Sequence, residues 1–268
     1  MGEKTLDTRA LNRALLSRQL LLRRHNLSVP HAVERIAGLQ TQYAPSAYIG
    51  LWSRLQGFRR SRLTQALEQG RVIQGTLMRV TIHIVSAGDY PLLTEAVRRP
   101  RREWWLRVGK DRALDEAGHR RVAEILRKAL EEGPRSRSEL IGILEAHGFS
   151  KGIWEGAGLW IDMIRVPPSG TWERRRADLY GLAPAASVTE AEGLEHLVRR
   201  YLGGFGPATP GDIADWGGVP LTTLKPVIES MTLRRFRDGN GRQLIDIPRL
   251  PLPAGETPAP VRFLPTWD

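Results

Sequence analysis

The stretch Thr81-Ile82-His83-Ile84-Val85 is the clearest indication of how this chain folds. It is rich in β-branched residues and alternates as a strand does, and the β-rich region that contains it begins at Val72. The segments that precede this region carry helical patterns instead. Helices that lead into a short β ribbon are the plan of a winged helix, so we predict that fold for the N-terminal part of the chain.

The region upstream of this ribbon has the periodicity of helices. Residues 8–25 interleave leucines with arginines, which predicts an amphipathic helix with a buried stripe and a basic outer face. Ser28 is suited to cap the next helix with Pro30 in its first turn, and we expect that helix to end near Gln40. Two further helices are predicted over residues 47–55 and 62–67.

The same order of elements recurs in outline further along the chain. A helix is predicted over residues 118–133. Ser136 or Ser138 is expected to cap the next helix, which should end near His147. The run 164–176 then combines turn residues with arginines, which is typical of a basic β wing. These features predict a second winged helix.

A third cycle of helices and hairpin follows. Residues 194–202 have a helical pattern, and Thr209-Pro210-Gly211-Asp212-Ile213 reads as a capped helix start with proline in the first position. A further helix is predicted over 221–231, although Pro226 should divide or kink it. Asp238-Gly239-Asn240-Gly241 lies between alternating segments and is a strong hairpin signal.

The predicted fold class is therefore helix-dominated α+β, with tandem winged helices, also called helix-turn-helix repeats, and short β wings. We expect the units to span residues 1–98, 99–186 and 187–250. Residues 251–268 read as a proline-rich connector followed by the start of a C-terminal β region. That β region is expected to be missing from this chain or only begun.

Composition excludes several classes of protein. The chain has 268 residues, of which 41% are hydrophobic, so it can bury more than one core, and it has no cysteine for disulfides, zinc–thiolate sites or thiol catalysis. The N-terminus does not read as a signal peptide, and no apolar run is long enough to span a bilayer. We expect a cytoplasmic monomer that does not associate with membranes.

The net charge points to a polyanionic partner. The formal charge is +11 at pH 7 and the excess is mostly arginine, whose planar guanidinium suits phosphate oxygens and guanine edges. Nucleic acid is the leading partner, although arginine enrichment that only solvates the surface would give a similar composition. The arginines in the basic helices and wings that we predict to contact DNA are Arg18, Arg23, Arg24, Arg54, Arg135, Arg137, Arg174, Arg175, Arg176, Arg234 and Arg235.

Conventional catalytic constellations are not evident in the sequence. Histidines at five positions do not pair at the spacing of metal ligands, and glycine-rich phosphate loops of the Walker or dinucleotide type are absent. We therefore expect neither a metal nor a cofactor. The histidines considered are His25, His31, His83, His119 and His147.

The amides of Gln40 and Gln42 are the unusual groups that remain. An amide is not a general base near neutral pH, but its oxygen and N–H groups can hold a water and align it for attack. Such help suffices when the leaving group is already good, as when a ring-alkylated purine departs from its sugar as a neutral base. The alternative is that both side chains cap the preceding helix or face solvent.

Longer stretches of the chain resemble a known enzyme family. The chain is similar to the winged-helix DNA glycosylases of the AlkZ and YcaQ type, and the likeness is strongest in the first predicted unit. The stretches that carry it lie at 36–48, 52–55, 75–85, 201–209, 212–216 and 261–265. The resemblance is weak over residues 100–180.

The resemblance implies roles for particular residues. In that family a Gln-x-Gln or Gln-x-Asp motif is catalytic, so Gln40 and Gln42 are the implied catalytic pair and place this chain with the AlkZ-type branch. Thr41 departs from the apolar residue usual between them, and would fit if its methyl group packs inward. The residues implied to support the site are Arg79, Thr81 and His83. A histidine on an alternating strand is more often structural than a proton donor.

The implied activity is monofunctional hydrolysis of the N-glycosidic bond of N7- or N3-alkylated purines in double-stranded DNA. The AlkZ branch also unhooks interstrand crosslinks, which implies the same for this chain. Two other classes stay open from the sequence. A winged-helix transcriptional regulator would bind a specific sequence without chemistry, because fold alone does not settle function. A structural or partner-binding protein whose charge serves solubility would bind DNA weakly even at low salt.

Overall fold

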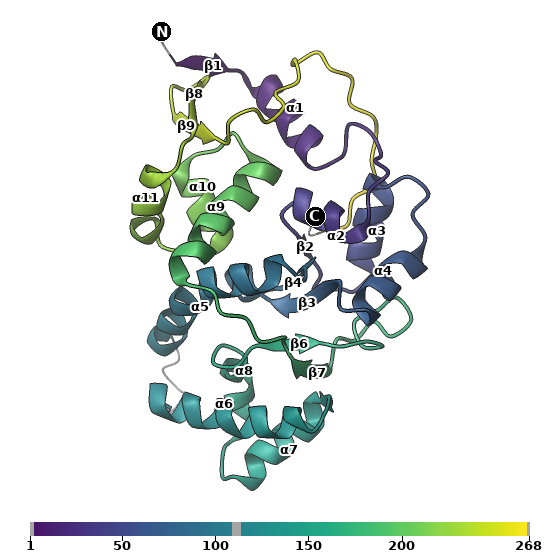
Figure 1. Cartoon of the computed structure of the whole chain (residues 1–268), viewed down its shortest axis with the longest axis vertical. Coiled ribbons are helices and arrows are strands. Elements are labelled where there is room, and N and C mark those ends of the chain that lie inside the picture. The colour runs from purple at the N-terminus through teal and green to yellow at the C-terminus, as the bar shows by residue number, and fades with distance from the viewer. Residues whose placement is uncertain (1–2, 109–113, 267–268) are drawn as a thin grey trace.

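The computed structural model describes residues 3–108 and 114–266 of the chain. Helices dominate, and the strands form two small sheets (Figure 1). This is the mixed, helix-rich α+β class predicted from the sequence. No helix within the described ranges is both long enough and apolar enough to cross a membrane.

The first part of the chain has the predicted order of helices and ribbon. Its elements are α1 (Thr8–Arg18), α2 (Val29–Arg35), β2 (Leu39–Gln40), α3 (Pro45–Arg54), α4 (Arg60–Glu68), β3 (Val72–Thr76), the 3₁₀ turn η1 (Met78–Val80) and β4 (Ile82–Ser86). Ser28 caps α2 as predicted, because its side chain accepts a hydrogen bond from the backbone N–H of His31. Strands β3 and β4 form the expected antiparallel ribbon.

Two helix ends differ from the prediction. Helix α1 ends at Arg18 and not at residue 25, and Leu20 then turns the chain with a φ of +57°. Helix α2 ends at Arg35 and not near Gln40, because Ala37 and Gly38 both adopt positive φ. The reversal directs the chain into β2, so Gln40 lies on a strand and not at a helix end.

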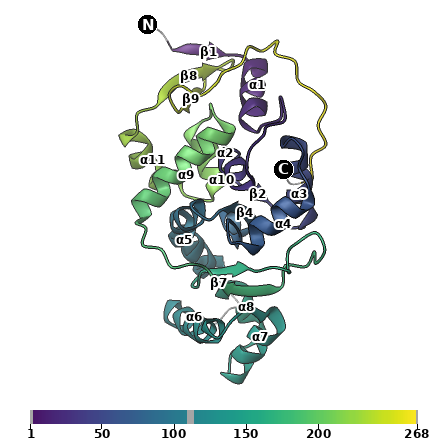
Figure 2. The same ribbon diagram turned by 45° about the vertical axis from the view of Figure 1, so that its right-hand side comes forward.

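The second part is built on a helix that the sequence analysis did not predict, α5 (Asp89–Val108). The other elements are α6 (Glu116–Glu131), β5 (Arg135–Ser136), α7 (Arg137–Ala146), η2 (Lys151–Ile153), α8 (Trp154–Ala157), β6 (Met163–Arg165) and β7 (Leu179–Leu182). Ser136 is the N-cap of α7 and forms a capping box with Glu139. Helices α6, α7 and α8 gather at one end of the molecule, beyond β7 (Figure 2).

The third part consists of α9 (Glu190–Phe205), α10 (Pro210–Gly217), α11 (Leu221–Ser230), β8 (Arg234–Asp238) and β9 (Gln243–Asp246). Thr209 caps α10 as predicted, with Pro210 in its first turn. The hairpin is also confirmed, since the Asp238 carboxylate accepts hydrogen bonds from the backbone N–H groups of Asn240 and Arg242. Pro226 lies inside α11 without dividing it into two elements.

The sheets connect parts of the chain that are distant in sequence. One sheet has six strands in the order β2-β4-β3-β6-β7-β5, so the ribbons of the first and second parts share it. The other has the order β1-β8-β9, in which β1 (Lys4–Leu6) pairs parallel to β8 at the opposite end of the chain (Figure 1). The N-terminal strand therefore belongs spatially with the third part. The division into units at residues 98, 186 and 250 stays a prediction.

The core is formed where α5 and α9 pack together. Leu93 and Val97 of α5 and Leu197 of α9 are fully buried in an apolar cluster that extends to strands β3, β4 and β9. Gly193 allows the close approach of the two helices, because an added Cβ there would lie 2.7 Å from the backbone oxygen of Leu92. This contact joins the second and third parts of the chain.

The C-terminal segment differs from its prediction. Residues 261–266 form no strand, and the segment passes from β9 over α1 towards α3, around the outside of the molecule (yellow in Figure 1). Two carbonyls of the segment accept hydrogen bonds from side chains: that of Thr257 from Arg13, and that of Phe263 from Ser53. The segment's own Arg262 donates to the carbonyl of Leu21 at 3.0 Å. Trp267 and Asp268 lie outside the described residues.

Candidate active site

The short strand β2 positions the two glutamines. Gln40 pairs with His83 of β4, and the backbone N–H of Thr41 continues the ladder by donating to the carbonyl of Ile82 at 2.7 Å. Thr41 is only 1% exposed, whereas Gln42 is exposed and Gln40 is partly exposed. Alternation along an extended chain therefore turns both glutamines to the same side and buries the residue between them. The position that the resemblance predicted to be apolar is filled here by a buried threonine.

The amide of each glutamine is held by a donor from the ribbon. The oxygen of Gln42 accepts a hydrogen bond from the backbone N–H of Ile82 at 2.8 Å. The oxygen of Gln40 accepts one from the guanidinium of Arg79 at 3.3 Å. A carbonyl oxygen has two lone pairs, so each amide keeps an acceptor position and presents its NH₂ group away from the donor that fixes it. Each amide is thus oriented by one hydrogen bond.

Arg79 links the glutamines to the third part of the chain. Its guanidinium also donates to the carbonyl of Trp216 at 2.7 Å, at the end of α10. The backbone of Arg79 has a φ of +51° and that of Val80 a φ of +58°, a left-handed conformation that costs about 1–2 kcal/mol for a residue with a Cβ. Strain of this kind is held only where surrounding contacts impose it, and here it sets the direction of Arg79.

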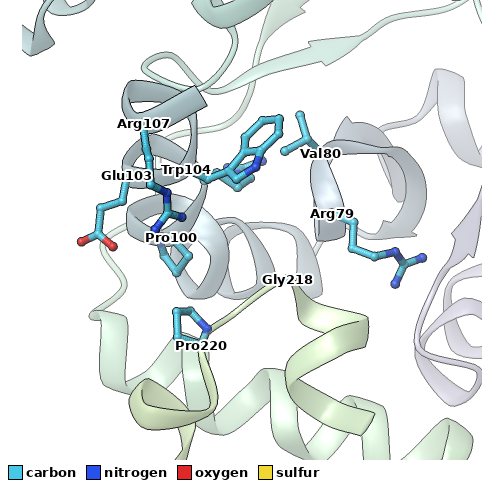
Figure 3. A pocket seen from close by; sticks show the side chains of 9 residues that line it. Arg79, Val80, Pro100, Glu103, Trp104, Arg107, Gly218 and Pro220 are labelled. Carbon is cyan, nitrogen blue, oxygen red and sulfur yellow. The ribbon is translucent and has the colours of Figure 1, made fainter. Parts of the chain in front are cut away.

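A cleft of about 440 Å³ opens on the other side of this turn (Figure 3). Its lining residues are Arg79, Val80, Pro100, Arg101, Glu103, Trp104, Arg107, Gly218 and Pro220. Figure 3 shows that the guanidinium of Arg79 points away from Trp104 and Pro100. Gln40 and Gln42 are not among these lining residues, and Arg79, which donates to Gln40, is the residue that connects the cleft with the pair.

Thr81 and His83 stabilise the ribbon beneath the pair. The hydroxyl of Thr81 donates to the carbonyl of Met78 at 3.0 Å and closes the turn. His83 is 3% exposed, with Nδ1 3.1 Å from the carbonyl of Thr81. Burial lowers the pKa of His83 to about 4, so its ring is neutral at pH 7. This geometry suits a structural role and not that of a cationic proton donor.

The arginine-rich loop between β6 and β7 reaches the glutamine motif. The guanidinium of Arg175 is exposed and donates to the hydroxyl of Tyr43, the residue after Gln42, at 2.9 Å. Arg174 and Arg176 are also exposed and pair with Asp178 at the base of the loop. The predicted wing therefore contributes positive charge next to the candidate active site.

Arg18 and Arg54 correct the predicted DNA-binding set. Arg18 is 3% exposed and forms two hydrogen bonds with the carboxylate of Asp246, at 2.7 and 2.8 Å. Arg54 is 1% exposed and donates to the carbonyls of Gln19 and Gly50. Both guanidinium groups are therefore inside the protein and are not available to DNA phosphates in this structure.

The other predicted arginines lie at the surface to differing degrees. Arg23, Arg137 and Arg235 are exposed. Three others are partly covered: Arg24 lies over the ring of Trp52, Arg135 pairs with Glu132, and Arg234 lies over the ring of Phe236.

His196 was missed by the sequence analysis. Its Nε2 lies 2.8 Å from the carboxylate of Asp89, which is 3% exposed and also accepts from Arg200 at 2.7 Å. The cluster joins the start of α5 to α9. Asp89 is 107 positions from His196 and 111 from Arg200, so no local motif could have indicated the cluster.

Two of three comparisons with known proteins find a match to this chain. A family model described as DNA glycosylase AlkZ-like matches residues 33–268. A search of the curated proteins finds no match. Among solved structures, the DNA glycosylase AlkZ of Streptomyces sahachiroi is similar, with a TM-score of 0.78 and 16% sequence identity, over 91% of this chain and 70% of that chain. At that identity the structural likeness shows a shared fold.

Proposed function

The chain belongs to the AlkZ-like DNA glycosylase family, and we propose that it hydrolyses the N-glycosidic bond of N7- or N3-alkylated purines in double-stranded DNA. Gln40 and Gln42 are the proposed catalytic pair. The observation that carries the proposal is the orientation of their two amides by Ile82 and Arg79, at the edge strand of the six-stranded sheet.

The two amides need only position a water molecule, because an alkylated purine is already a good leaving group. Alkylation at a ring nitrogen makes the purine cationic, so it leaves as a neutral base while positive charge develops on the sugar. Gln40 and Gln42 then need only hold a water against the anomeric carbon, with an amide oxygen accepting one of its hydrogen bonds. The hydrogen bonds from Arg79 and Ile82 favour one orientation of each amide, which supports positioning of this kind.

The proposed reaction is monofunctional. Water forms a bond to the anomeric carbon as the bond to the base breaks, and its second proton is released to solvent, which leaves a hydroxyl group on the sugar. No amine of the protein forms a Schiff base. The products are a free alkylated purine and an abasic site in an unbroken strand.

Interstrand crosslinks are included in the proposal because of where the pair lies. Gln42 is exposed and neither glutamine lines the cleft of Figure 3, so the lesion need not be threaded into an enclosed pocket. A purine tethered to the opposite strand resists full extrusion from the helix. A site on an open edge suits such a substrate.

Binding is proposed to depend on exposed arginines around this edge. Arg175 stands next to the motif, and Arg174, Arg176 and Arg23 are exposed. Contacts of guanidinium groups with phosphates release counterions, so the affinity for DNA should fall steeply as salt rises. Arg18 and Arg54 are left out of the proposed interface because they are buried.

The test is base release from a duplex that carries one 7-methylguanine. Free 7-methylguanine would be measured by mass spectrometry, and the strand would be examined before and after alkali treatment. The proposal expects free base and a strand that breaks only in alkali. A chain that binds the duplex but releases no base would contradict it and would favour a non-enzymatic DNA-binding regulator. An undamaged duplex is the control.

A further inference from the structure

Aromatic rings and arginines alternate on the surface that begins at the glutamine motif. Tyr43 follows Gln42 and is 51% exposed. The guanidinium of Arg175 lies 6.0 Å from the centre of the Tyr43 ring and 5.8 Å from that of Trp172, in the loop between β6 and β7. The guanidinium of Arg60 lies 4.9 Å from the Trp172 ring. Trp172 is therefore contacted by two cations.

Trp172 forms one wall of an apolar pocket of about 310 Å³. The residues of this aromatic pocket are Tyr48, Ile49, Trp52, Phe58, Arg60 and Trp172. Trp52 is 45% exposed, which is unusual for so large an apolar side chain. Tyr48 is fixed from below, because its hydroxyl lies 2.9 Å from that of Thr64 and its ring meets Trp172 edge-on.

The charge around the aromatic pocket is positive. Arg24 lies 4.7 Å from the centre of the Trp52 ring, so guanidinium groups from Arg24, Arg60 and Arg175 border the exposed rings. A flat aromatic surface next to fixed cations suits a ligand with a flat ring and an adjacent anion. A nucleotide has both, and base stacking on aromatic side chains tolerates any base.

We propose that the aromatic pocket takes an unstacked nucleobase of the DNA bound at Gln40 and Gln42, with the neighbouring phosphate on the arginines. This inference rests on the proposed function only for the position of the DNA. Stacking in the pocket would hold open the helix beside the lesion, which gives water and the glutamine amides access to the sugar. Tyr43 and Arg175 connect the two sites directly.

The experiment measures binding and needs no lesion. Two duplexes would be compared, one with a single unpaired 2-aminopurine and one fully paired. The intact chain should quench the fluorescence of 2-aminopurine as the base stacks. Trp52→Ala and Trp172→Leu should each weaken binding of the bulged duplex about tenfold and abolish the quenching, while binding of the paired duplex changes less than about twofold.

The control is Trp104→Ala, because Trp104 is a tryptophan of similar exposure, 42%, on α5 and outside the aromatic pocket. It should leave both duplexes unaffected. Trp172→Phe keeps an aromatic face and should restore most of the quenching, which a purely structural loss would not. Circular dichroism and thermal melting would identify a variant that fails to fold, and Trp52→Ala then serves alone because that side chain is exposed.

The inference is overturned if Trp52→Ala and Trp172→Leu bind the bulged duplex as tightly as the intact chain, or if Trp104→Ala loses the quenching equally. This result is independent of base release from 7-methylguanine. Quenching that depends on Trp52 without any base release would refute only the proposed function. Base release without such quenching would refute only the stacking site.

Discussion

Removing one partner of the buried pair of Arg18 and Asp246 should strongly destabilise the protein. The side chains are 2% and 0% exposed, and two hydrogen bonds of 2.7 and 2.8 Å join them. Arg18 also donates to the carbonyl of Leu202 at 2.7 Å. The pair therefore ties α1 to β9 and to the end of α9.

Asp246→Ala is the informative perturbation. It leaves a guanidinium in the interior without its counter-charge, and breaking one partner of a buried pair costs about 3–5 kcal/mol. The retained bond to Leu202 places the expected loss near the lower end, about 3 kcal/mol. For a chain of this size that corresponds to a fall in Tm of roughly 6–12 °C.

Urea and thermal unfolding followed by circular dichroism would measure the loss. Arg235→Ala is the matched control, because Arg235 lies on the neighbouring strand β8 but is exposed, and it should change stability by less than about 0.5 kcal/mol. Replacing both charges at once, with Arg18→Met and Asp246→Leu, should recover much of the stability. A loss below about 1 kcal/mol in Asp246→Ala would refute the reasoning.

Three further predictions concern other parts of the molecule. Arg175→Ala should reduce the salt dependence of DNA binding by about one unit of slope in log K against log salt, and an unchanged slope would remove Arg175 from the interface. The pKa of His83, about 4, lies below its ordinary 6.5, so the unfolded chain takes up the proton first as the pH falls. The free energy of unfolding should therefore fall as the pH is lowered from 6.5 to 4. The His83→Gln variant should lose less of this free energy over the same pH range, which urea titrations at several pH values would measure. Gly218→Ala should cost about 1 kcal/mol, because Gly218 ends α10 at a φ of +66°; equal unfolding curves would contradict this.

Local signals explain what the sequence predicted well. Caps at Ser28, Ser136 and Thr209 bond to backbone N–H groups three residues away, and the Asp238 turn fixes its own hairpin. Interactions over so few residues depend only on the local sequence, so a local pattern can predict them. The helix starts at these three caps and the hairpin were therefore correct, whereas α5 was not predicted and α9 begins at Glu190 and not at residue 194.

Contacts between distant residues explain the errors. Arg18 was assigned to a basic surface, but its partner Asp246 is 228 positions away, and β1 pairs with a strand near the other end of the chain. Helices α1 and α2 end early, before Leu20 and Ala37, which adopt positive φ. Neither residue is a glycine, so the residue type did not indicate a left-handed backbone at these positions. Tertiary packing overrides helix periodicity at such positions.

The candidate site was predictable only in part. Gln40 and Gln42 were singled out as unusual groups, and the family resemblance gave them their proposed roles. Their fixation by Ile82 and Arg79 depends on strand register and on a strained turn, neither of which a motif records. The approach of Arg175 to Tyr43, 132 positions away, requires the fold itself.

The rate of 7-methylguanine release under single-turnover conditions tests the role of the glutamine pair most directly. Gln40→Ala and Gln42→Ala would be compared with the intact chain and with Gln69→Ala, an exposed glutamine at the end of α4, at concentrations that saturate the DNA. We predict a fall of about a hundredfold or more in each motif variant, no change in Gln69→Ala, and equal DNA affinity throughout. Release by both motif variants within about twofold of the intact chain would contradict a catalytic role for the pair.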